Sequence, residues 1–176
     1  MGVVVDTNVT MVASRHTPAA DERCINACVQ RLREIQQSGG LLVDDKGLIL
    51  REYTRKLGFK GQPGAGEAFA KWAHDNQAIP GKVSQVPITQ RSDNGWRRYD
   101  EFPDLADLER FDKSDQKFVA VALASGESPP IVNAVDSDWW NHRNALNVAG
   151  VTVEFLCPQH AGDDRVVRTS QPSTLR

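Results

Sequence analysis

The chain begins with a buried-strand pattern that ends on an acid. Residues 2–5 form a continuous run of mostly β-branched residues, and Asp6 follows directly. Continuous rather than alternating apolarity is typical of a strand covered on both faces, as in a parallel sheet. The acid then lies at the carboxyl end of its strand, which is where ligands bind in open α/β sheets. This segment therefore predicts an α/β fold with a functional residue at one edge of the sheet.

Further strands and helices alternate along the chain. We predict strands at 2–5, 41–43, 130–133 and 151–156, and helices at 22–37, 48–57, 67–76, 114–124 and 137–147. Strands that alternate with helices need crossover connections, so the sheet is expected to be central and mostly parallel. The pattern is weakest between Gly58 and Arg110, a region that includes a long polar loop at 85–103.

Length and composition favour one globular domain. The chain has 176 residues, of which 40% are hydrophobic, and this is enough to bury a core. We expect a single domain over 1–158, with an insertion at about 58–111 and a flexible tail over 159–176. The net charge of −2 excludes binding driven by a strongly basic whole surface, but it allows a local basic patch.

Several features predict a cytoplasmic protein without a membrane partner. The longest purely apolar run, 118–124, is far shorter than the roughly 20 residues that span a bilayer. The first residues do not resemble a secretion signal. Three cysteines do not form a paired framework, which fits a reducing compartment.

Acids recur where a site would lie in such a fold. Asp136 and Asp138 follow the 130–133 strand, while Glu52 and Asp115 fall on otherwise apolar helical faces. Taken singly, each acid is explained as well by a helix cap or a solvated charge. Together, converging carboxylates would repel one another unless a cation neutralised them, and hard oxygen ligands suit Mg²⁺ or Mn²⁺.

Four segments resemble, in order, the motifs of the PIN-domain nucleases. Residues 3–9 are similar to the opening motif, in which a strand delivers an Asp followed by Thr or Ser and a polar residue. Segments 50–53 and 114–122 are similar to the second and third motifs, and 131–139 to the fourth. The fourth has one extra residue, which leaves open whether Asp136, Asp138 or both face a metal.

The resemblance implies a three-layer α/β/α fold and metal-dependent phosphodiester hydrolysis. It also implies a ligand set for Mg²⁺ or Mn²⁺, namely Asp6, Glu52, Asp115, Asp136 and Asp138. Thr7, Asn8 and Asn133 would orient these carboxylates, although a plain strand-end hydrogen bond explains Asn133 as well.

PIN nucleases act mostly on RNA, so an endoribonuclease is expected here, with DNA as a possible substrate. Cations that could hold phosphates are Arg51, Arg55, Lys56, Lys113 and Lys117. The loop residues Arg91, Trp96, Arg97, Arg98 and Tyr99 mix cations and rings, as base-stacking loops do. A solvated, mobile loop whose Trp packs locally is the simpler interpretation. The chain could be a toxin with an antitoxin partner, and a homodimer is common in the family. A catalytically silent binding or scaffold module is the alternative.

Two other patterns carry less weight. Asp44 and Asp45 look like the acidic pair of a receiver domain, but no Asp stands where the phosphoacceptor would follow. Cys24, Cys28, Cys157 and His160 offer four zinc ligands. The first two cysteines lie on the apolar face of a predicted helix, where buried, inert thiols are usual.

Overall fold

The structure is a computed structural model, and it describes residues 1–161. Its strands are β1 (Val4–Val5), β2 (Leu41–Asp44), β3 (Val83–Val86), β4 (Ile131–Asn133) and β5 (Val153–Phe155). Its helices are α1 (Thr7–Ala13), α2 (Glu22–Ser38), α3 (Leu48–Leu57), α4 (Ala65–Asp75), α5 (Gln116–Ala124), α6 (Ser137–Asn141), α7 (Arg143–Val148) and α8 (Pro158–Ala161), with a short 3-10 helix, η1 (Ala106–Leu108).

The strands form a small parallel sheet. β4 lies between β1 and β5, and β2 pairs with β3, all in parallel register. A parallel bridge between Val3, just before β1, and Leu41 of β2 joins the β1–β4–β5 strands to the β2–β3 pair. The sequence-based expectation of an α/β fold with a mostly parallel sheet is therefore confirmed.

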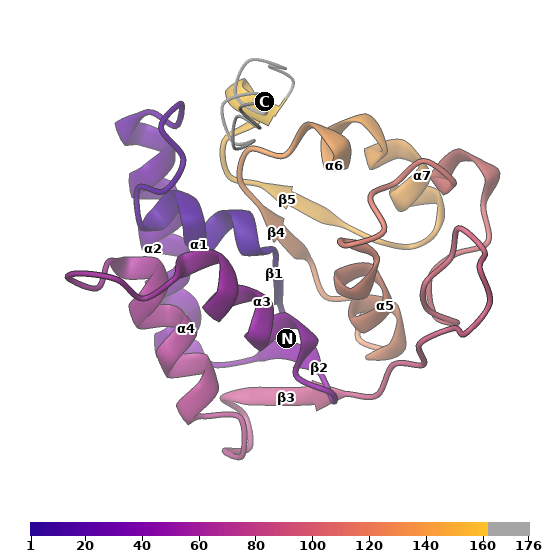
Figure 1. Cartoon of the computed structure of the whole chain (residues 1–176), viewed down its shortest axis with the longest axis horizontal. Helices are drawn as coiled ribbons and strands as arrows, with labels where there is room; N and C mark the ends of the chain where they lie inside the picture. Colours follow the sequence, from indigo (N-terminus) through magenta and orange to yellow (C-terminus); the bar gives the residue numbers. More distant parts are fainter. Residues whose placement is uncertain (162–176) are drawn as a thin grey trace, which may run out of the picture.

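Helices lie on both sides of the strands. In Figure 1, α1 to α4 gather on one side of β1, and α5 lies on the other. Val4 and Val5 are completely buried, as the continuous apolar run predicted. Phe118 and Val121 of α5 are buried as well, so this helix belongs to the core.

Besides the short elements η1 and α8, the sequence did not predict α1 and β3. α1 follows Asp6 at once, and its β-branched residues are poor helix formers. An Asp cap and burial of its Val9 and Val12 side chains stabilise it instead. β3 was missed because it holds two buried valines around two exposed polar residues, which is too weak a pattern to identify a strand. The predicted 137–147 helix is in fact two short helices, α6 and α7.

The 58–111 region is integrated into the fold. Phe69 of α4 is completely buried and packs against Tyr53 of α3. The 85–103 loop is also held in place. Its Trp96 ring meets Phe102 edge-to-face, and Arg97 donates hydrogen bonds to two carbonyls of the loop. Trp96 therefore packs against its own loop, as the simpler interpretation predicted.

The C-terminal part and the cysteines differ from expectation. Residues 159–161 belong to α8, and Ala161 is buried, so the predicted tail does not begin at 159. The rest of that tail, 162–176, lies outside the described residues. Cys24 and Cys157 form a disulfide, so the interpretation of Cys24 as an inert thiol was wrong, whereas Cys28 is a buried free thiol. Among residues 1–161, no helix has both the length and the apolar content that crossing a bilayer requires.

Candidate active site

Asp6 lies at the carboxyl end of β1 and is almost fully buried. Its Oδ1 accepts a hydrogen bond from the Asn8 backbone at 2.8 Å, which caps α1. Burial raises the pKa of Asp6 to about 8, and the negative charges of Asp136 and Glu52 add to the rise. A carboxylate in these surroundings has a high affinity for a proton or another cation.

Asp115 and Asp136 lie close enough to Asp6 to repel it. Asp115 is the first residue before α5, and Asp136 caps α6 just after β4. Burial raises the pKa of Asp115, with further contributions from the charges of Asp6 and Asp136. Burial likewise raises the pKa of Asp136. The fold thus brings Asp6 near two acids that follow it by more than 100 positions in the sequence.

Asp138 is turned to other partners. Its Oδ2 accepts a hydrogen bond from the Asp112 backbone at 2.8 Å, and its Oδ1 lies 3.1 Å from the His142 ring. Burial raises its pKa, and the negative charge of Asp112 adds to the rise, while the hydrogen bond from the Asp112 backbone and the contact with His142 oppose it. Of the two acids in the fourth segment, Asp136 is therefore the one placed against Asp6.

Glu52 reaches the same edge of the sheet from α3. Its Oε1 accepts a hydrogen bond from the Thr7 hydroxyl at 2.7 Å. Its Oε2 lies 2.6 Å from the ammonium nitrogen of Lys117, which also donates to the Ser114 carbonyl. Sequence reasoning named Lys117 only as a rim cation, and it missed this ion pair because the pair joins helices 65 positions apart.

The two asparagines connect β1 to β4. Asn8 Oδ1 accepts a hydrogen bond from the Ala134 backbone at 2.9 Å, and Asn133 Nδ2 lies 3.5 Å from Asp6 Oδ2. Asn133 Oδ1 also accepts from the Asp136 backbone. Asn133 therefore contacts both acids and holds the two strand ends in register. The side-chain nitrogen Nδ2 of Asn8 is buried and has no hydrogen-bond acceptor among the described residues.

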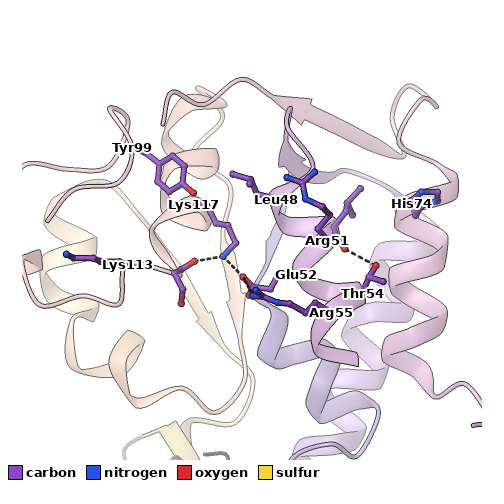
Figure 2. Close-up of a pocket in the computed structure, with 11 residues that line it drawn as sticks. Leu48, Arg51, Glu52, Thr54, Arg55, His74, Tyr99, Lys113 and Lys117 are labelled. Carbon is purple, nitrogen blue, oxygen red and sulfur yellow. Dashed lines mark hydrogen bonds and ion pairs between the residues drawn. The ribbon is translucent and has the colours of Figure 1, made fainter. Parts of the chain in front are cut away.

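A cationic pocket of about 740 Å³ lies beside the acids. Figure 2 shows Arg51, Arg55, Lys113 and Lys117 around it, together with Glu52. Four of the five predicted rim cations thus line one cavity, and Lys56 does not. Tyr99 is the residue of the predicted stacking loop that lines it.

The acidic residues have the chemistry of a hard-cation site, but they are spread apart. Within residues 1–161, no three acidic side chains bring their carboxylate oxygens within 4.8 Å of one another. The donors are all oxygen, and Asp6 and Asp115 are buried while Glu52 and Asp136 are partly buried. Lys117 is the cation that lowers the pKa of Asp6 and Asp115. Carboxylates of this kind fit Mg²⁺ or Mn²⁺ if side-chain rotation draws them together.

Asp44 of the receiver-like pair has a structural role. Its carboxylate accepts hydrogen bonds from the backbones of Lys46, Leu48 and Ile49, so it fixes the start of α3. This helix carries Glu52, so Asp44 helps to position Glu52 without itself lying in the site.

Comparison of the chain with family models, curated proteins and solved structures found no significant match.

Proposed function

We propose that the chain is a divalent-metal-dependent nuclease with a three-layer, PIN-like arrangement of helices around its sheet. The observation that carries the proposal is that Asp6, Glu52, Asp115 and Asp136 lie near enough to interact electrostatically at one sheet edge, beside a pocket lined by four cations. In general, grouped carboxylates suit a divalent metal ion, and neighbouring cations attract phosphate groups. This pairing suits a polyanionic substrate, and single-stranded RNA is the substrate that we favour.

Asp6, Asp115 and Asp136 would hold Mg²⁺ or Mn²⁺, with Glu52 beside them. The bound ion would supply an activated water and neutralise charge on the scissile phosphate. Thr7 and Lys117 fix the Glu52 carboxylate, and Asn133 fixes Asp6 against Asp136. Arg51, Arg55 and Lys113 are all exposed and would contact backbone phosphates. Arg51 also donates to the Lys46 carbonyl, and Arg55 lies 4.0 Å from the Glu52 carboxylate.

The test is a cleavage assay on RNA and DNA strands of matched sequence, with Mn²⁺ or with EDTA. We expect the native protein to cut RNA only with metal, and Asp6→Asn to reduce cleavage by at least about 100-fold. Asp107→Asn, which changes an exposed acid on η1, is the matched control and should cut normally. Cleavage that persists in EDTA or in Asp6→Asn would refute the proposal.

A catalytically silent nucleic-acid-binding module is the second candidate. The Lys117–Glu52 pair favours it, because the lysine already neutralises one of the proposed metal ligands. A binding module would hold RNA in EDTA as firmly as with Mn²⁺ and would not cut it. Fluorescence anisotropy with labelled RNA measures this, and Arg51→Ala/Arg55→Ala should weaken binding under either candidate function.

A further inference from the structure

Three cysteine sulfurs gather in the core, separate from the acidic edge and its pocket. Cys24 and Cys28 stand four positions apart on α2, and Cys157 lies just after β5. The ligand atoms of all three lie within 4.8 Å of one another, and each residue is at most 1% exposed. Two helical thiols one turn apart, facing a third thiol, offer three convergent soft donors.

The disulfide uses only two of these sulfurs. Cys28 remains a free thiol beside the Cys24–Cys157 bond, and burial raises its pKa to about 12. Such a thiol is a poor nucleophile, so exchange with the disulfide is disfavoured. A thiophilic metal ion would deprotonate it on binding, as metals do for their cysteine ligands.

A histidine follows the third cysteine closely in the chain, although neither of its ring nitrogens lies within 4.8 Å of all three sulfurs. His160 follows Cys157 by three positions, and its backbone donates to the Cys157 carbonyl at 2.9 Å. Its Nε2 lies 3.0 Å from Asp21 Oδ2 but is not aligned for a hydrogen bond, and this nitrogen is buried. Asp21 in turn caps α2 by accepting from the Cys24 backbone. The imidazole therefore packs against the helix end that carries Cys24.

We propose that, once the disulfide is reduced, Cys24, Cys28 and Cys157 bind a zinc ion, with His160 as the fourth ligand after its ring turns from Asp21 toward the sulfurs. A dithiol supplies two electrons and two protons, which converts the disulfide to two thiols while the dithiol is oxidised. Zinc then displaces three protons from the three thiols and keeps its own oxidation state. Either state joins α2 to the segment after β5, through sulfur when oxidised and through metal when reduced.

The test is a Co²⁺ titration of the whole chain after reduction with a phosphine under anaerobic conditions. A thiol assay first verifies that three thiols are free. We expect one Co²⁺ per chain to give thiolate charge-transfer bands and the visible bands of tetrahedral cobalt, and we expect Zn²⁺ to displace that ion. In Cys28→Ser the Co²⁺ affinity should fall by at least about tenfold, while the Cys24–Cys157 disulfide still forms in air.

His160→Gln should keep the charge-transfer bands but weaken Co²⁺ binding, and circular dichroism verifies the fold of each reduced variant. The proposal fails if the folded, reduced chain gives no thiolate–cobalt bands, or if Cys28→Ser binds Co²⁺ as tightly as the native chain. It also fails if the reduced chain is unfolded and neither Co²⁺ nor Zn²⁺ restores its circular dichroism.

Discussion

The ammonium nitrogen of Lys117 lies 2.6 Å from the Glu52 carboxylate, and the two side chains are only 6% and 11% exposed. This pair joins α5 to α3 beside the buried acids. Removing one member of a buried ion pair leaves an uncompensated charge, which costs more than the pair itself contributes. Lys117 is therefore a structural cation as well as part of the pocket wall.

We expect Lys117→Met to lower the free energy of unfolding by about 3 kcal/mol, because it leaves the Glu52 carboxylate without its ion-pair partner. The double variant Glu52→Gln/Lys117→Met should recover part of that loss, since no buried charge is then left alone. Urea denaturation measures both. Lys113→Met, an exposed cation on the same pocket, should change stability little. Equal losses in the Lys113 and Lys117 variants would show that the pair is not buried in solution.

The Asp6 pKa predicts how stability depends on pH. Burial and the neighbouring acids raise this pKa from 3.8 to about 8, so the native state keeps a proton that the unfolded chain loses. The resulting stabilisation is complete below pH 3.8 and is lost as the pH rises through about 8. Its slope is at most about 1.4 kcal/mol per pH unit. We expect unfolding in urea with EDTA to show this decline.

In Asp6→Asn the side chain is neutral at every pH, so the decline should be shallower and the variant should exceed native stability most at pH 8. Some slope should remain, because the pKa values of Asp115 and Asp136 are also raised. Asp107→Asn should keep the native slope. A native protein whose stability rises between pH 4 and 8 would contradict the placement of Asp6.

Local patterns predicted much of this fold. The 48–57 helix was predicted with the bounds that α3 has, because its apolar stripe and its flanking glycines mark both ends. Asp6 was predicted at a strand end because the apolar run stops there abruptly. β3 and α1 could not be predicted in this way, since burial by distant segments stabilises them rather than their own residue preferences.

The site was harder to predict than the fold. The spacing of the fourth segment did not distinguish Asp136 from Asp138, because that choice depends on which acid reaches Asp112 and His142. The role of Lys117 depends on α5 lying against α3. Cys24 and Cys157 are separated by 133 positions, so nothing local indicates that they meet. Contacts between distant segments decide all three.

A divalent metal should raise the melting temperature if the acids bind it. A ligand present at 100 times its Kd stabilises the native state by about 2.7 kcal/mol, which for this length corresponds to roughly 5–10 °C. We expect that shift with Mn²⁺ for the oxidised native chain and for Asp138→Asn. Asp136→Asn should lose most of it, because Asp136 is the acid that faces Asp6. A shift that is lost in Asp138→Asn but kept in Asp136→Asn would reverse this assignment.

The Cys24–Cys157 disulfide closes a loop of 133 positions and ties α2 to the end of β5. In the chain-entropy account, a crosslink of this span stabilises the native state by up to about 5 kcal/mol. We therefore expect a phosphine reductant, with EDTA present, to lower the urea midpoint of the native chain substantially. The urea midpoint of Cys24→Ser/Cys157→Ser should equal that of the reduced native chain and should not change when the reductant is added. The midpoint of Cys28→Ser should fall on reduction as that of the native chain does. Identical midpoints for oxidised and reduced native protein would mean that the crosslink does not form in solution.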